Sequence, residues 1–119
     1  MRNFRDLLAW QVSFELARLV YQHTERFPQE ETFGLKSQMR RAAVSIPSNL
    51  AEGAGRSTKK EFSHFVTVAR GSLNELQTQV LLSAALGFLT QDSLPPLQAR
   101  IDRLYALLNG LRNSLNAQR

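Results

Sequence analysis

The chain has 119 residues, 43% of them hydrophobic and none of them cysteine, and it carries a formal net charge of +5 at pH 7. This length and composition predict a single globular domain over residues 1–119 with one hydrophobic core. The lack of cysteine excludes disulfides, thiol nucleophiles and thiolate metal sites. No uninterrupted apolar segment is long enough for a signal peptide or a membrane span, so we expect a cytoplasmic protein without a membrane partner.

The positive charge is concentrated in one region. Residues 36–70 hold seven basic and two acidic side chains, whereas the rest of the chain holds eight of each. Localised basic charge attracts polyanions such as nucleic acids. It is also found on solvated helix surfaces that keep a protein soluble. Both interpretations stay open at this point.

Apolar residues recur every three or four positions in four segments, the spacing of helices with one buried face. The first segment, from about Asp6 to Phe27, places on this face Leu7, Trp10, Phe14, Ala17, Tyr21 and Thr24. The second ends near Gly53 and has the apolar positions Leu35, Met39, Ala42, Ile46 and Leu50.

The third segment begins at the capping-box sequence Thr58–Glu61, ends near Gly87, and presents Phe62, Val66, Ala69, Leu73, Leu76 and Val80. The fourth opens at Ser93 and Leu94, has two prolines in its first turn, and presents Leu97, Ile101, Leu104, Leu108, Leu111 and Leu115. No strand pattern competes with these four helices.

Pro47 lies inside the apolar pattern of the second helix. It has no N–H to donate to the carbonyl of Ala43, and its ring crowds that carbonyl, so we expect a kink at residues 45–47. A proline in a helix interior costs roughly 3 kcal/mol. We therefore expect the bend to serve a packing or binding geometry that a straight helix could not supply.

The connections between the four helices are short, and the last two helices keep a seven-residue apolar repeat. These features predict an all-α fold, an antiparallel up-down-up-down four-helix bundle with a proline-kinked second helix. Bulky apolar residues also occur outside the predicted core faces: Phe4, Leu8, Leu16, Leu19, Phe33, Phe65, Leu81, Leu82, Phe88 and Leu107. Some can widen the core, but a bundle of this size has limited interior, so the surplus predicts self-association.

Three parts of the sequence form a recognisable combination: Phe4-Arg5-Asp6-Leu7 with Trp10-Gln11, then Gln38-x-Arg40-Arg41-Ala42-x-x-Ser45-Ile46-Pro47-Ser48-Asn49-Leu50-Ala51-Glu52-Gly53, then Gly71-Ser72-Leu73-x-Glu75-Leu76. This combination resembles the four-helix bundle family of 23S rRNA intervening-sequence proteins over nearly the whole chain. The resemblance implies an antiparallel bundle that assembles into a ring, typically a homopentamer. A related branch, the accessory variability proteins of diversity-generating retroelements, works with a reverse transcriptase and binds nucleic acid.

The spacing of Glu61 and His64 is found in di-iron bundle sites, which need a second Glu-x-x-His motif. The other histidine, His23, has Val20 at that spacing. We therefore predict no metal site and interpret Glu61 as a helix cap.

Ser45 and Ser48 are possible nucleophiles, but neither has a histidine or lysine within a helical turn to act as a base. We expect both to bond to backbone carbonyls freed by Pro47. No phosphate loop, dinucleotide fingerprint or recognisable carboxylate pair is present. We therefore expect no enzymatic activity, no cofactor and no small-molecule substrate.

A polar stripe repeats every three or four residues along the second helix and consists of Gln38, Arg41, Ser45, Asn49 and Glu52. Polar groups in helical register can form a hydrogen-bonded network with a neighbouring helix or subunit, and Glu75 and Gln79 are the expected partners. An ordinary solvent-facing flank is the alternative. The family motif spans these positions and favours a structural network.

The candidate nucleic-acid contacts are Lys36, Arg40, Arg56, Lys59, Lys60 and Arg70. At ~1.5 Å rise per residue, Arg40 and Arg56 are ~24 Å apart along an unbroken helix, so the charges fall toward two ends of a monomer. A ring would gather them into basic belts suited to sequence-independent contact with RNA or DNA phosphates. We expect a non-enzymatic, oligomeric nucleic-acid-binding or accessory protein. The alternative is a protein-interaction scaffold whose basic surface is incidental.

Overall fold

The computed structural model describes residues 3–117, which form helices without any strand among them. The four long helices are α1 (Leu8–Thr24), α2 (Leu35–Ala54), α3 (Lys59–Ala85) and α4 (Leu94–Ala117). Two short 3-10 helices precede α1 and α2, namely η1 (Phe4–Asp6) and η2 (Gln29–Glu31). The predicted all-α four-helix fold is confirmed.

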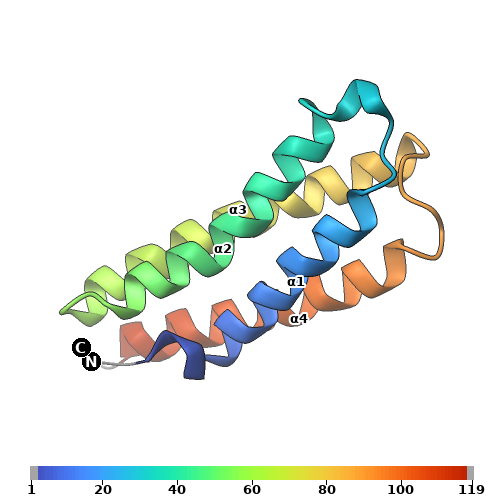
Figure 1. The fold of residues 1–119 in the computed structure, drawn as a ribbon. Helices are drawn as coiled ribbons and strands as arrows, with labels where there is room; N and C mark the ends of the chain where they lie inside the picture. Colours follow the sequence, from blue (N-terminus) through green and yellow to red (C-terminus); the bar gives the residue numbers. More distant parts are fainter. Residues whose placement is uncertain (1–2, 118–119) are drawn as a thin grey trace.

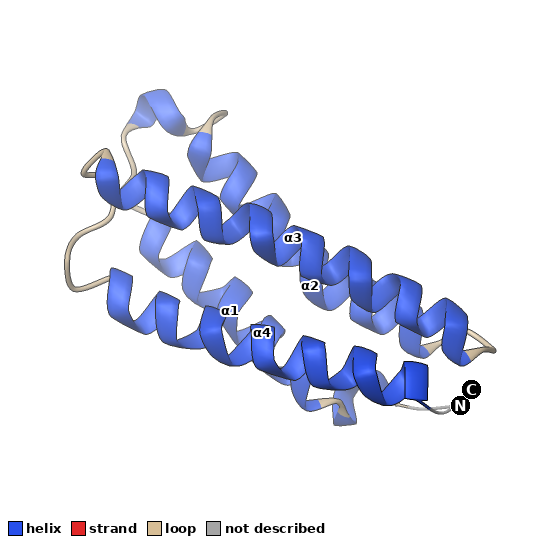
Figure 2. Ribbon diagram, turned by 180° about the vertical axis from the view of Figure 1, so that it is seen from behind, coloured by secondary structure: helices blue, strands red, loops and turns tan. Residues whose placement is uncertain are grey.

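The four long helices pack lengthwise around one core (Figures 1 and 2). Each packs against the next one in the chain, and α4 also packs against α1. The molecule measures 47 × 23 × 20 Å. One end carries the start of α1, the loop between α2 and α3 and the end of α4; we call it the loop end (Figure 1). The opposite end carries the α1–α2 and α3–α4 connections.

The ends of α3 follow from local chemistry. Thr58 caps the first turn, because its hydroxyl oxygen accepts a hydrogen bond from the backbone N–H of Glu61 and its hydroxyl donates to the Glu61 carboxylate. This confirms the predicted cap. Gly87, which follows the last turn, has a φ of +80° that residues with a side chain rarely adopt. The helix therefore ends where the sequence predicts.

The predicted apolar faces of the last three helices form most of the core. Of these positions, only Leu35 and Leu111 are partly exposed, and the others are buried. Burying such side chains stabilises the fold by about 1.5–3 kcal/mol each, before the loss of chain entropy is counted. The side chains with no exposed surface on these helices include Met39, Ile46, Leu50, Val66, Leu73, Leu76, Leu97, Ile101, Leu104 and Leu108.

The predicted core face of α1 is right only in part: Thr24 is buried, and Leu7, Trp10 and Ala17 are partly buried against the core. The buried face consists of Ala9, Val12, Ser13, Leu16, Val20 and Thr24. Phe14 and Tyr21, which we expected inside, are 53% and 44% exposed, whereas Leu16 is fully buried. Both faces of α1 carry apolar residues at helical spacing, so periodicity alone could not select between them. The helix is also shorter than predicted, since it ends at Thr24.

Pro47 lies within α2, which continues as one helix on both sides of it, and its ring is buried. The predicted kink at this point stays a prediction.

Helices α2 and α3 approach each other closely at Gly53. A β-carbon added there would lie 2.7 Å from Cβ of Phe65 and 3.0 Å from Cδ1 of Phe62. Since real β-carbons almost never come so near another atom, only glycine fits at this position without moving α3.

Among the described residues, no helix combines the length and the apolar character that crossing a membrane requires.

Candidate nucleic-acid interface and polar pocket

Three of the predicted nucleic-acid contacts lie at the loop end of the bundle. Arg56 is in the loop that joins α2 to α3, and Lys59 and Lys60 form the first turn of α3. All three residues are exposed. We call them the basic cluster.

Members of the basic cluster differ in whether a nearby carboxylate neutralises their positive charge. The Arg56 guanidinium is 2.7 Å from the Glu52 carboxylate and lies over the Phe65 ring, 4.9 Å from its centroid. Lys59 and Lys60 form no ion pair within residues 3–117. Both lysines line a hollow of about 330 Å³ between the start of α3 and the end of α4. Its other lining residues are Ser63, Leu115 and Asn116.

Arg40 and Lys36 lie near the opposite end of the bundle, in the first half of α2. Arg40 is bound to the end of α1: Nε donates to the Thr24 hydroxyl at 3.0 Å, and Nη2 donates to the Tyr21 carbonyl at 3.1 Å. The guanidinium also lies 4.4 Å from the centre of the Tyr21 ring. A cation at a helix C-terminus satisfies carbonyls that have no intrahelical partner. The structure therefore gives Arg40 a capping role.

Arg70 lies in the middle of α3 and faces α4. Its Nε donates to Oδ1 of Asn109 at 2.9 Å, and its guanidinium lies 5.6 Å from the centre of the Tyr105 ring. Because these contacts hold Arg70 against α4, Arg70 is not part of the basic cluster. Of the six predicted contacts, the structure thus brings three together in the basic cluster. Lys36 and Arg40 lie one turn apart on α2 and line a separate hollow, and Arg70 belongs to neither group.

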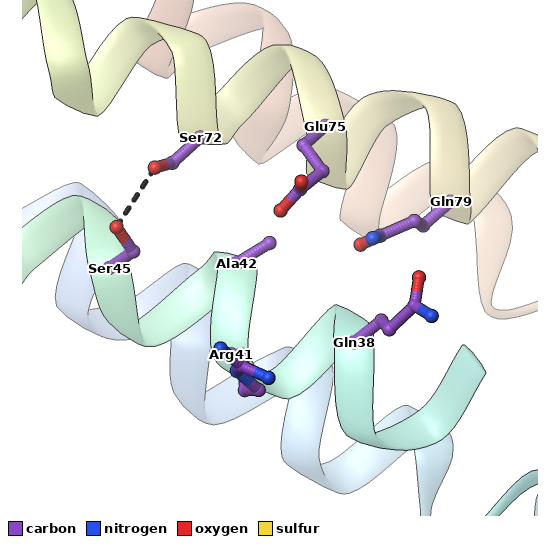
Figure 3. A pocket seen from close by; sticks show the side chains of 7 residues that line it. All are labelled: Gln38, Arg41, Ala42, Ser45, Ser72, Glu75 and Gln79. Carbon is purple, nitrogen blue, oxygen red and sulfur yellow. Dashed lines mark hydrogen bonds between the residues drawn. The ribbon is translucent and has the colours of Figure 1, made fainter. Parts of the chain in front are cut away.

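The polar stripe of α2 faces α3 across a pocket of about 400 Å³ (Figure 3). We call this cavity the polar pocket. The side chains that line it come from α2 and α3 and are Gln38, Arg41, Ala42, Ser45, Ser72, Glu75 and Gln79. Three members of the predicted stripe are therefore brought together with both of their expected partners.

One end of the polar pocket is closed by hydrogen bonds. The hydroxyl oxygens of Ser45 and Ser72 are 2.9 Å apart, and Nδ2 of Asn49 donates to the Ser45 hydroxyl oxygen at 3.0 Å. Ser45 therefore bonds to α3, and the expectation that it bonds to a carbonyl freed by Pro47 is wrong. The last member of the stripe, Glu52, pairs instead with Arg56.

Ser72 is the pocket residue that the sequence reasoning missed. It precedes Glu75 by three residues and Gln79 by seven, so all three lie on one face of α3. This spacing was available in the sequence and could have identified it.

A further hollow, of about 430 Å³, lies between α1 and α2 and is mostly apolar. We call it the aromatic groove. Its walls are Trp10, Phe14, Ala17, Arg18, Tyr21, Val44, Pro47, Ser48 and Ala51. It contains the exposed face of α1 that the sequence had placed in the core.

Neither histidine lies in a metal-binding cluster. Glu61 bonds to Thr58, while the His64 ring lies 5.4 Å from that of Phe65. Nδ1 of His23 is 2.8 Å from the Ser93 hydroxyl oxygen and links α1 to the start of α4. Within residues 3–117, no three His, Asp or Glu side chains come close enough to hold a metal ion.

The fold and these surfaces define a small four-helix bundle protein with a basic end and a polar seam between its second and third helices. The family model of the 23S rRNA-intervening sequence proteins matches residues 5–110, and the chain belongs to this family. No match is found among curated proteins.

Proposed function

We propose that this protein is a self-associating, non-enzymatic nucleic-acid-binding protein whose basic cluster contacts phosphates without reading the base sequence. The observation that carries the proposal is the position of Lys59 and Lys60 in the first turn of α3. The positive end of a helix dipole lies there, so two cations at this point oppose folding. Residues that work against stability are more often retained for binding than for the fold.

Access supports the same proposal. Lys59 and Lys60 are exposed and unpaired within the described residues, and Arg56 keeps 42% of its side chain exposed beside Glu52. Contacts of this kind release counterions from nucleic acid and depend strongly on salt. The family is named for sequences that interrupt 23S rRNA, so RNA is the first nucleic acid to test.

Self-association is supported by the apolar surface. The aromatic groove exposes Phe14 and Tyr21. At the end of α3 and just after it, Leu81, Leu82 and Leu86 are 53%, 47% and 54% exposed. Apolar patches of this kind on a small domain favour contact with another protein surface. A ring of copies, five according to the resemblance, would repeat the basic cluster around its axis and strengthen phosphate contact. As an accessory protein it would act with a nucleic-acid enzyme such as a reverse transcriptase.

A protein-interaction scaffold is the second candidate function. The aromatic groove favours it, because an apolar groove between two helices can hold an apolar segment of another protein. In that case the basic cluster serves only solubility.

Salt dependence distinguishes the two candidates. The affinity for a labelled single-stranded RNA and a duplex DNA is measured by fluorescence anisotropy between about 50 and 200 mM salt. For the duplex, log K should fall by about 0.9 per neutralised phosphate for each unit of log salt. When Arg56, Lys59 and Lys60 are all replaced by glutamine, the slope should therefore become shallower by the amount that corresponds to about three neutralised phosphates.

The matched control replaces Arg26, Arg100 and Arg103 with glutamine. It removes the same charge from residues outside the loop end, so the slope should change little. Arg112 is unsuitable as a control because it lies in the part of α4 that reaches the loop end. No binding at about 50 mM salt, or equal losses in both triple variants, would favour the scaffold instead.

A further inference from the structure

The polar pocket plays no part in the proposed phosphate contact. It lies in the middle of the α2–α3 seam, away from the basic cluster, and its lining combines one cation, one anion, two amides and two hydroxyls (Figure 3). Its charges are balanced, so it does not suit a polyanion. A different ligand chemistry is needed to explain it.

The pocket exists because a small residue lies where the two helices face each other. Ser45 and Ser72 meet across the seam. One turn away from this contact Ala42 of α2 lies beside Glu75 of α3, and a further turn away Gln38 lies beside Gln79 (Figure 3). Ala42 is 2% exposed and its methyl group leaves the space in front of Glu75 unfilled. The floor of the pocket is therefore Ala42, between a serine pair and a glutamine pair.

Gln79 has an unmet hydrogen-bonding requirement. The residue is only 8% exposed, and its Oε1 is buried without a hydrogen-bond donor within residues 3–117. Buried polar atoms almost always have a partner, and leaving one without a partner costs about as much as a lost hydrogen bond. A nearby amide pair has both of its partners: the amide groups of Gln77 on α3 and Gln98 on α4 bond to each other at 2.9 and 2.6 Å. Gln79 Oε1 is thus free to accept a hydrogen bond from an N–H or O–H group that enters the pocket.

The two charged side chains define the rest of the ligand. Arg41 projects from α2 and Glu75 from α3, both are exposed, and neither forms an ion pair within the described residues. A guanidinium suits a carboxylate, which it can bind with two parallel hydrogen bonds. The Glu75 carboxylate and the nearby Oε1 of Gln79 are both hydrogen-bond acceptors, so together they suit an ammonium group, which has only donors.

We propose that the polar pocket binds a small zwitterion of the amino-acid type, with its carboxylate on Arg41 and its ammonium group shared by Glu75 and Oε1 of Gln79. The volume of about 400 Å³ leaves room for a short side chain beside Gln38. This is a binding role with no reaction. Sequence reasoning indicated no small-molecule substrate, because the space above Ala42 arises only when α2 and α3 pack.

Thermal unfolding and NMR test the proposal on the full-length protein. Glycine, L-glutamine, L-glutamate and L-arginine are added singly, with acetate and methylammonium at equal ionic strength as half-ligands. We expect at least one amino acid to raise the melting temperature and to shift the side-chain amide signals of Gln79. At ten times the dissociation constant, the ratio of folded to unfolded protein should rise about 11-fold. Acetate and methylammonium should have no comparable effect.

Variants then assign the contacts. Arg41→Gln and Glu75→Gln should each weaken binding by about tenfold to a hundredfold, because each removes a charge-assisted hydrogen bond. Gln79→Leu should abolish binding while the free protein unfolds at the same or a higher urea concentration, since it removes the orphaned oxygen. Gln77→Leu is the matched control: it should lower stability, by breaking the Gln77–Gln98 pair, and leave binding unchanged.

Three results would overturn the proposal. The first is the absence of any shift at about 10 mM amino acid, well above the millimolar range of weak specific binding. A second is Gln79 signals that change with protein concentration alone, which would assign the pocket to a second copy of the chain. The third is a double-mutant cycle in which Gln38→Met and Gln79→Leu each destabilise the protein and are strongly coupled, which would make the glutamines partners of each other. The triple glutamine variant of the basic cluster should still bind the amino acid, so a failure of the proposed nucleic-acid function leaves this test intact.

Discussion

The hydroxyl oxygens of Ser45 and Ser72 lie 2.9 Å apart and join α2 to α3 at the edge of the polar pocket. Asn49 donates both to the Ser45 hydroxyl oxygen, at 3.0 Å, and to the Ser45 carbonyl, at 2.8 Å. The pair is therefore held from one side by a neighbour one turn along α2. It marks the register in which the two helices meet.

Replacing Ser72 with alanine removes the bond across the seam and should lower the free energy of unfolding by about 0.5–1.5 kcal/mol. Ser45→Ala should cost a similar amount, and the double variant should cost less than the sum, because both single changes delete the same bond. Urea unfolding measures all three. Ser114→Ala, on an exposed part of α4, is the control and should change stability by less than about 0.5 kcal/mol. Additive losses would contradict this account.

Arg40→Lys should destabilise the protein, because lysine cannot reproduce two hydrogen bonds from a planar guanidinium while stacking on Tyr21. We expect a loss of about 1–3 kcal/mol, measured by thermal unfolding, since bonds from a charged donor are among the stronger ones. Arg26→Lys, nearby and exposed, should have little effect. If Arg40→Lys instead leaves stability unchanged and weakens RNA binding, Arg40 belongs to the nucleic-acid surface.

Self-association should depend on the aromatic groove. Light scattering at micromolar concentration should give a mass several times 13.5 kDa, and Phe14→Ser together with Tyr21→Ser should reduce it toward the monomer. Both rings are about half exposed, so the substitutions should leave the helical circular dichroism intact. Phe33→Ser is the matched control, because Phe33 is 94% exposed but lies outside the groove. Loss of assembly with Phe33→Ser alone would place the contact elsewhere.

Pro47→Ala tests the predicted kink. Alanine favours a straight helix by roughly 3 kcal/mol relative to proline, yet Pro47 is buried and lines the aromatic groove. We expect the variant to weaken assembly, as measured by sedimentation velocity. Unchanged assembly combined with a higher melting temperature would show that the proline is dispensable.

Burial raises the pKa of the Tyr105 phenol, and Asp102 acts in the same direction while Arg70 opposes it. The unfolded tyrosine therefore loses its proton first as the pH rises past about 10. The contribution of Tyr105 to stability is present below that pH and is lost as the pH rises through the folded pKa. Urea unfolding should show this decline, and Tyr105→Phe should reduce it. A phenolate titration in a Tyr21→Phe background gives the pKa directly; a value below 10 would contradict the prediction.

The core of α2, α3 and α4 could be predicted from the sequence because each of these helices has one dominant apolar face. α1 has two, and the choice between them depends on fit: small Ala9 lies on the buried face, while the bulky rings of Phe14 and Tyr21 stay at the edge. No local pattern contains that information.

The surfaces were predictable only in part, for a related reason. The polar stripe was visible because its members repeat along one helix. Arg40 could not be assigned as a cap, since its partners Thr24 and Tyr21 belong to another helix whose end must first be brought beside it. The basic cluster could be located because its residues are close in sequence, around a loop whose ends were marked by Gly55 and Thr58.

Gly53 sets a limit on how the basic cluster can vary. Because the backbone of α2 nearly touches Phe62 and Phe65 at this point, the distance between the two helices is determined by main-chain contact rather than by the size of interchangeable side chains. This contact therefore also determines the separation between Arg56 and the two lysines. Substitutions in the cluster can alter its charge, but a longer reach would require inserting residues into the loop itself.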